Sequence, residues 1–139
     1  AGYGTKELDW WQDKKIANEP GYTTDLLAQY ATDFIGRNKE RPFFLYLAQA
    51  APHEPWQGRD SARKMSPVET YREMIGILDE SVGKVIEALS QNDLEKNTLV
   101  IFCSDNGPAG PRGFAANDLL RGKKGSMYEG GLRQAAMAW

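Results

Sequence analysis

Two short apolar runs, separated by a long amphipathic segment, constrain the fold of this chain more than any other feature. The runs cover residues 43–48 and 98–103. An unbroken apolar run of this length suits a strand buried on both faces, as in a parallel sheet. Between the runs, residues 66–90 repeat apolar side chains at helical spacing. Because another helical pattern precedes the first run, the order predicts a right-handed parallel βαβ unit in an α/β fold, with a mostly parallel sheet flanked by helices.

Each predicted helix carries signals for where it begins. Thr23 and Thr24 offer N-caps for a helix over residues 24–37, and Asp25 adds a negative charge to its first turn. The second helix opens with the letters SPVE at 66–69, a capping box with proline at the first helical position. We predict irregular structure in three other stretches, 1–22, 49–65 and 91–97.

Composition narrows the class of protein. With 41% apolar and 26% charged residues over 139 positions, the chain has the make-up and the length of one soluble globular domain. A net charge of −2 gives no reason to expect nucleic-acid binding. No apolar run approaches the roughly 20 residues that a membrane span needs. The chain begins without methionine and stops inside the apolar stretch 137–139, so we expect an interior segment of a longer domain.

The single cysteine, Cys103, excludes an internal disulfide and a cysteine zinc cluster. It lies inside the second apolar run without an adjacent base. We therefore expect a buried and unreactive thiol rather than a nucleophile.

Two loops follow the carboxyl ends of the predicted strands. His53 lies in the first loop, and Asp105 opens the second loop directly after Ser104. Ligands of open parallel sheets bind beyond the carboxyl ends of the strands, and parallel strands bring those ends to the same edge. The chain order therefore predicts that His53 and Asp105 belong to one site.

Asp105 and Asn106 place a carboxylate and an amide carbonyl side by side at a strand end. Both are hard oxygen ligands of the kind that Ca²⁺ or Mg²⁺ takes, although a shell of about six to eight ligands needs further oxygens from elsewhere. The alternative is a simple turn, because Asn-Gly is a strong hairpin signal. Pro108 and the lack of a returning alternating strand speak against a hairpin.

Two other features could bind an anion. His53 is the only histidine and could donate to an anionic oxygen or carry a proton, although a lone loop histidine is often merely exposed. Residues 121–126, RGKKGS, combine glycines that allow close backbone approach with compact lysine charges. They do not fit the Walker pattern, and a solvated basic loop is the alternative. Half of the 14 glycines lie between residues 105 and 131, and a loop of that length is usually functional.

Four ordered motifs resemble the sulfatase family, which belongs with the alkaline phosphatase superfamily. They cover about residues 20–135, and the ordered set is more specific than any one motif. The motifs are PFFLYL at 42–47 with APHEP at 51–55, LDESVG at 78–83 with NTLVIF at 97–102, SDNGP at 104–108, and LRGKKGSMYEGGLR at 120–133.

The resemblance implies that residues 1–139 are the central part of a sulfatase catalytic domain, whose complete form hydrolyses sulfate esters, most readily those of carbohydrates. By resemblance, Asp105 and Asn106 are two ligands of a catalytic Ca²⁺, with Mg²⁺ as the other candidate. Lys124 contacts the sulfate group, and His53 hydrogen-bonds the sulfate or the leaving oxygen. Export to the periplasm, the lysosome or the medium is also typical of the family.

The chain departs from the family pattern in two respects. It has no C/S-x-P-x-R motif, from which sulfatases make their formylglycine nucleophile, and Cys103 is followed by Ser104 instead. The paired aspartates that complete the metal site are absent too. We expect both in sequence upstream, so the 139-residue polypeptide should be inactive and poorly stable alone. Two alternatives are a phosphodiesterase-type hydrolase of the same superfamily and a non-catalytic binding module.

Overall fold

The computed structural model describes residues 8–109 and 119–139. Helices and strands follow one another in a mixed order that fits an α/β chain. In sequence order they are β1 Trp11–Gln12, β2 Lys15–Ile16, α1 Thr23–Asn38, α2 Pro67–Gln91, the 3₁₀ turn η1 Glu95–Asn97, β3 Ile101–Cys103, α3 Glu129–Leu132 and β4 Ala136–Ala138.

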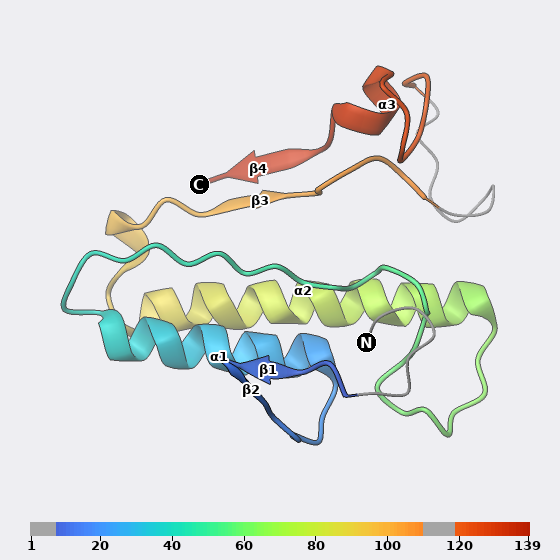
Figure 1. The fold of residues 1–139 in the computed structure, drawn as a ribbon. Helices are drawn as coiled ribbons and strands as arrows, with labels where there is room; N and C mark the ends of the chain where they lie inside the picture. The colour runs from blue at the N-terminus through green and yellow to red at the C-terminus, as the bar shows by residue number, and fades with distance from the viewer. Residues whose placement is uncertain (1–7, 110–118) are drawn as a thin grey trace.

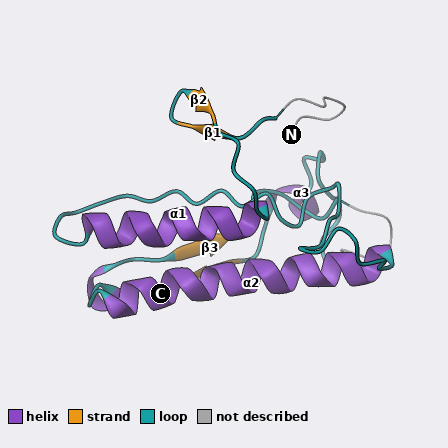
Figure 2. Cartoon of the chain, turned by 90° about the horizontal axis from the view of Figure 1, so that it is seen from below, coloured by secondary structure: helices purple, strands orange, loops and turns teal. Residues whose placement is uncertain are grey.

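The two long helices lie side by side and form one layer (Figures 1 and 2). Over that layer runs the extended segment 43–50, with the pair β3–β4 beyond it (Figure 1). Segment 43–50 and β3 run in the same direction, so the loops that follow them leave at the same end of the molecule (Figure 1). This shared end is where the sequence predicts the site.

Both predicted helices are confirmed within one or two residues at each end. The capping box of α2 is complete, because the Glu69 backbone N–H donates to Ser66 Oγ at 3.4 Å and the Ser66 backbone N–H donates to the Glu69 carboxylate at 2.8 Å. The Ser66 hydroxyl also donates to the Glu69 carboxylate, at 2.7 Å, and this bond together with the one from the Ser66 backbone N–H holds the pKa of Glu69 below its ordinary value. The cap fixes where α2 begins and therefore how long a face it offers to α1.

The core lies between the two layers, where apolar faces meet. Its buried centre is formed by Ile35 of α1 with Ala88 and Leu89 of α2. Phe34 and Phe43 meet edge to face with ring centroids 5.6 Å apart, which is a favourable aromatic arrangement. The surrounding half-buried side chains are Phe43, Leu45, Val85, Leu94 and Val100. Both apolar runs of the sequence therefore contribute to one core.

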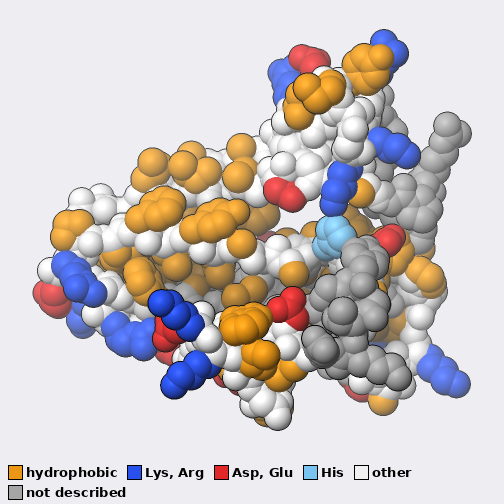
Figure 3. All heavy atoms as spheres, in the orientation of Figure 1, with side chains coloured by type: hydrophobic (Ala, Val, Ile, Leu, Met, Phe, Trp, Pro, Cys, Tyr) orange, Lys and Arg blue, Asp and Glu red, His pale blue; other side chains and the backbone are white. Residues whose placement is uncertain are grey.

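The prediction that 43–48 is a strand buried on both faces is wrong for the described part of the chain. Within residues 8–109 and 119–139, this segment is extended but hydrogen-bonds to no neighbouring strand. Its side chains alternate, since Phe43 and Leu45 face the helices while Phe44 and Tyr46 are 87% and 81% exposed. Figure 3 shows hydrophobic side chains exposed on the surface above the two helices. The helices cover one face, and nothing described covers the other.

The second predicted strand is shorter than expected and differs in its partner. β3 pairs with β4 in antiparallel register, so that Phe102 lies opposite Met137. All residues of both strands are exposed, including Cys103, so the expectation of a buried thiol is wrong. The described residues contain no parallel ladder, because both of their sheets are two-stranded and antiparallel.

Three smaller features complete the comparison with the sequence. The stretch expected to be irregular before residue 23 contains a small hairpin, β1–β2, in which Asp13 has a positive φ of 54°. The glycine-rich region contains one helical turn, α3. Its residues 110–118 lie outside those that the structure describes. No helix among the described residues combines the length and the apolar character that a membrane crossing requires.

We predict that Ser66→Ala destabilises the protein by about 1 kcal/mol, because α2 loses the hydroxyl that satisfies an otherwise unpaired backbone N–H. Urea denaturation followed by circular dichroism measures this change. Ser61→Ala is the matched control, since Ser61 is exposed and precedes the helix. Equal stability of the two variants would contradict the cap's role.

We further predict that the 139-residue polypeptide binds the apolar dye ANS, because Phe44 and Tyr46 expose aromatic surface on an uncovered face. The double substitution Phe44→Ser with Tyr46→Ser should lower the dye fluorescence at least twofold. Trp11→Ser removes another exposed apolar side chain, 56% exposed, from the separate hairpin and serves as the control. A larger effect of the control would show that the dye binds elsewhere.

Candidate anion and metal site

His53 lies on the loop that follows segment 43–50, and its side chain is exposed. The loop turns sharply there, because the His53 backbone N–H donates to the Ala50 carbonyl at 2.9 Å. Both flanking prolines, Pro52 and Pro55, follow cis peptide bonds. His53 Nδ1 lies 2.7 Å from the Glu54 carbonyl oxygen, which can only accept, so Nδ1 carries the proton.

The structure brings His53 and Lys124 together across 71 residues of sequence. His53 Nε2 lies 3.1 Å from Lys124 Nζ. An ammonium group has only donors, so Nε2 accepts in this contact and the imidazole carries its proton on Nδ1. Figure 3 shows the histidine side chain directly below a basic side chain. One nitrogen of each residue therefore reaches the same point on the surface.

Backbone contacts tie the lysine loop to the loop that carries Asp105. The Lys124 backbone N–H donates to the Pro108 carbonyl at 3.1 Å, and the Gly107 N–H donates to the Gly131 carbonyl at 3.1 Å. His53, Lys124 and the loop that begins after β3 therefore form one continuous rim. That His53 and Asp105 belong to one site stays a prediction, which this chain of contacts between their loops supports.

Glycine at 107 and at 130 lets these loops touch backbone to backbone. A Cβ placed on Gly107 would overlap the Gly130 carbonyl oxygen. A Cβ placed on Gly130 would lie 2.5 Å from the Gly122 oxygen and 2.8 Å from the Arg121 oxygen. Neither position has room for any side chain, so the packing of the rim depends on glycine at both.

Asp105 and Asn106 have the chemistry of a partial metal site. Asp105 is exposed at the end of β3, and Asn106 beside it is half-buried. The Asn106 backbone oxygen accepts from Ser104 Oγ at 3.0 Å. It also accepts from the Gln134 side-chain amide at 3.0 Å, in the orientation of that amide that satisfies both of its ends. These bonds fix the backbone, and the Asp105 carboxylate and the Asn106 amide oxygen are ligand types that suit a hard cation.

Those two residues cannot hold a metal by themselves. Within the described part of the chain, no group of three or more His, Cys, Asp or Glu side chains gathers closely enough to bind an ion. A divalent cation here therefore fits the donor set of Asp105 and Asn106 only if further oxygens approach from outside these residues.

The lysine loop is shaped by a contact that the sequence motifs did not single out. The Arg121 guanidinium lies 3.8 Å from the centroid of the Tyr128 ring and donates to Tyr128 Oη at 2.8 Å. Arginine stacks well on aromatic faces because its charge is planar and weakly hydrated. A basic residue seven positions before a tyrosine is too weak a pattern to reveal this pair.

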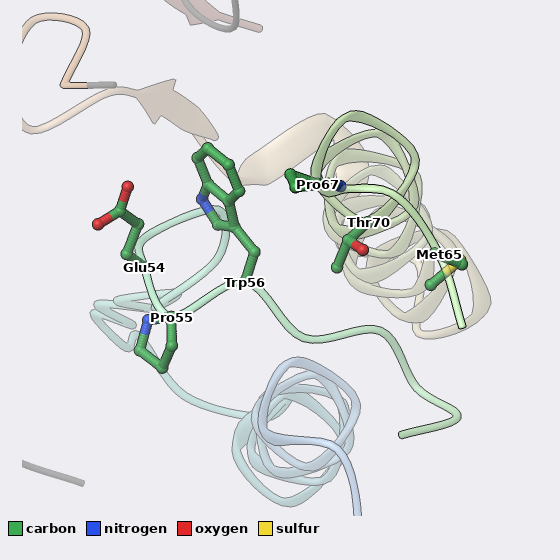
Figure 4. A pocket seen from close by; sticks show the side chains of 6 residues that line it. All are labelled: Glu54, Pro55, Trp56, Met65, Pro67 and Thr70. Atoms are coloured by element: carbon green, nitrogen blue, oxygen red, sulfur yellow. The ribbon is translucent and has the colours of Figure 1, made fainter. Parts of the chain in front are cut away.

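A shallow cavity of about 330 Å³ lies on the other side of the histidine loop, next to the start of α2. Figure 4 shows Trp56 between the loop residues Glu54 and Pro55 and the helix residue Thr70. The cavity lining includes none of His53, Lys124, Asp105 and Asn106. The candidate site is therefore an exposed rim in the described residues rather than a closed pocket.

Comparison with known proteins gives a consistent result. The family model described as Sulfatase matches residues 2–139. Human N-acetylgalactosamine-6-sulfatase is 36% identical over 120 residues, which cover 84% of this chain and 23% of that protein. Human arylsulfatase A is 35% identical over 131 residues, covering 89% and 26%. The chain thus spans about a quarter of the length of these curated relatives.

A solved structure shares the arrangement of the chain. The crystal structure of Ps i-CgsB in complex with k-i-k-neocarrahexaose superposes with a TM-score of 0.79 at 38% identity. The match covers 91% of this chain and 30% of that one. At this identity, the likeness extends through sequence as well as fold.

We predict opposite effects of two glycine-to-alanine substitutions. Gly130→Ala should destabilise the protein by about 1–3 kcal/mol, because its Cβ meets three backbone oxygens that cannot move independently. Gly76→Ala should stabilise it by about 1 kcal/mol, since Gly76 lies exposed in α2 with nothing within 4 Å of the new methyl group. Thermal unfolding of both variants provides the test. A tolerated Gly130→Ala would mean that the loops do not meet as described.

Proposed function

This chain belongs to the sulfatase family, and we propose that the complete protein hydrolyses sulfate esters with His53, Lys124, Asp105 and Asn106 forming part of its active site. The observation that carries the proposal is the 3.1 Å contact between His53 Nε2 and Lys124 Nζ on the rim that Asp105 shares. An ammonium group and an imidazole beside two metal-ligating oxygens suit a bound anion.

Lys124 stabilises negative charge in this proposal. It is half-buried, and its backbone is held by Pro108, so its position is restrained at the rim. A compact ammonium with three donors can turn from His53 Nε2 toward a sulfate oxygen without a change of backbone. The ammonium group then stabilises the negative charge that develops on the sulfate oxygens, and it needs no rearrangement of the backbone to do so.

His53 acts at the ester oxygen. Because Nδ1 donates to the Glu54 carbonyl, only Nε2 can face the substrate. Donation from Nε2 requires a proton on that nitrogen as well, because Nδ1 keeps its own proton toward the Glu54 carbonyl. His53 can therefore hydrogen-bond the leaving oxygen, or pass it a proton as a general acid.

Asp105 and Asn106 would hold a divalent cation, with Ca²⁺ proposed and Mg²⁺ as the alternative. When bound, the cation offsets charge on the sulfate oxygens, and the formylglycine that the family uses supplies the attacking oxygen. Neither group is needed to account for the positions of His53 and Lys124. The rest of the metal shell would come from parts of the complete protein beyond these residues.

A sulfated carbohydrate is the substrate class we propose. Support comes from the names of two relatives, an N-acetylgalactosamine-6-sulfatase and a structure with a bound neocarrahexaose. An exposed rim also suits a large and flexible substrate better than a closed cavity would.

We also propose that segment 43–50 and β3 are parallel strands of a larger, mostly parallel sheet in the complete protein. Their common direction and the alternating exposure of 43–50 support this (Figure 1). A strand from elsewhere in the protein would satisfy the unpaired backbone groups and cover Phe44 and Tyr46. The α/β class itself does not depend on this step.

The proposed function predicts that Asp105→Ala abolishes metal-dependent turnover of a sulfate ester by the complete enzyme, because the cation loses a charged ligand. The measurement is the rate of sulfate release after chelation and readdition of Ca²⁺ or Mg²⁺. Asp33→Ala removes an exposed carboxylate from the surface of α1 and should change the rate less than twofold. Near-normal turnover of Asp105→Ala with unchanged metal dependence would refute the assignment.

A further inference from the structure

The loop that carries His53 is fastened to both helices a few residues further on, and one side chain makes most of the attachment. Arg59 Nε donates to Asp25 Oδ2 at 2.7 Å, and its Nη2 donates to Asp25 Oδ1 at 2.8 Å. The same Nη2 donates to Glu80 Oε2 at 2.5 Å. Asp25 lies on α1 and Glu80 on α2, so a single guanidinium joins the loop to both helices.

The backbone around Arg59 is held as well. The Arg59 N–H donates to Glu73 Oε1 at 3.2 Å, and Tyr22 Oη donates to the Gln57 carbonyl at 2.8 Å. Between them, Gly58 is so close to the Glu73 carboxylate that a Cβ would lie 2.9 Å from Oε2. Gln57 and Arg59 are thus hydrogen-bonded to Tyr22, directly before α1, and to Glu73 of α2.

Aromatic packing continues the attachment toward His53. The Trp56 ring meets the Tyr71 ring of α2 at a centroid distance of 5.5 Å, and Trp56 Nε1 donates to the Pro52 carbonyl at 3.2 Å. Figure 4 shows Trp56 standing between the loop and the start of α2. The loop is therefore attached to α2 at Trp56 as well, and Trp56 in turn holds Pro52, the residue before His53.

The guanidinium contact is bidentate and charge-assisted, which is the strongest geometry for an arginine and a carboxylate. Its effect is visible at Asp25, whose pKa is lowered chiefly by hydrogen bonding to Arg59. Arg59 itself is 37% exposed and Glu80 is 55% exposed. Ion pairs at such exposure contribute little to global stability.

These observations separate two roles that a salt bridge can have. A pair that contributes little to folding can still decide where a loop lies, because a surface loop opens at a lower free energy than the folded core does. His53 meets Lys124 from this loop, and a displacement of about 1 Å at a reacting group can cost a large factor in rate.

We propose that Arg59 is a positioning residue for His53 in the sulfate ester hydrolysis proposed above. It touches neither substrate nor metal. It fixes the position of the loop relative to α1 and α2, so that His53 Nε2 stays within reach of Lys124 and of the ester oxygen. The proposal rests on the proposed function only for its effect on rate, since the loop attachment itself is independent of activity.

The matched variants are Arg59→Gln and Lys84→Gln in the complete enzyme. Lys84 Nζ also binds Asp25, at 3.3 Å, but it lies on α2 and does not connect to the loop. Each variant removes one cation from the same carboxylate, that of Asp25. We expect Arg59→Gln to lower kcat about tenfold to a hundredfold with KM changed less than about threefold. Lys84→Gln should leave kcat within about twofold.

Three further measurements separate positioning from folding. The melting temperatures of the two variants should agree within a few degrees, and Arg59→Lys should recover part of kcat because one carboxylate remains within its reach. Hydrogen exchange of the His53 amide, which is bonded to Ala50 in the wild type, should quicken in Arg59→Gln and stay unchanged in Lys84→Gln.

The proposal is overturned if both variants lose kcat equally, or if the loss in Arg59→Gln only follows its loss of folded protein. Unchanged exchange at His53 in Arg59→Gln would also overturn it. If the wild-type enzyme released no sulfate from any ester, the proposed function would fail instead. The exchange measurement would still decide whether Arg59 holds the loop.

Discussion

Packing of α1 and α2 against the first extended segment is the interaction on which the rest of the structure depends. Ile35, Ala88 and Leu89 form the buried centre, and Phe43 and Val100 bring both apolar runs onto it. Because the helices hold the two runs in a common direction, the loops after them emerge at one end (Figure 1). Without that alignment, His53 and the residues after β3 would have no reason to meet.

The candidate site is assembled mainly by backbone. Gly107 and Gly130 allow three loop segments to approach without side chains between them, and hydrogen bonds from Lys124 and Gly107 lock the approach. This arrangement leaves the side chains of Asp105, Asn106 and Lys124 available for a ligand. A rigid support built from main-chain contacts is a physical advantage where charged groups must stay in place for an anion.

The sheet layer shows the opposite condition. Segment 43–50 and β3 expose apolar side chains and unpaired backbone, although their sequences have the apolar character of interior strands. Strand pairing is a contact between distant segments, and its partners are not determined by the strand's own sequence. The apolar pattern therefore predicted two extended segments but could not predict their neighbours. The prediction that Cys103 is buried was wrong for the same reason.

The sequence by itself determined the two helices, the capping box at Ser66 and the motifs that carry His53, Asp105, Asn106 and Lys124. Those features arise from periodicity and from residues near one another in the chain, so local chemistry is enough to predict them. Only the tertiary structure decided that His53 meets Lys124, that Arg59 joins its loop to both helices, and that β3 pairs with β4. Each of these contacts spans tens of residues, and its geometry depends on how the helix layer orients the loops.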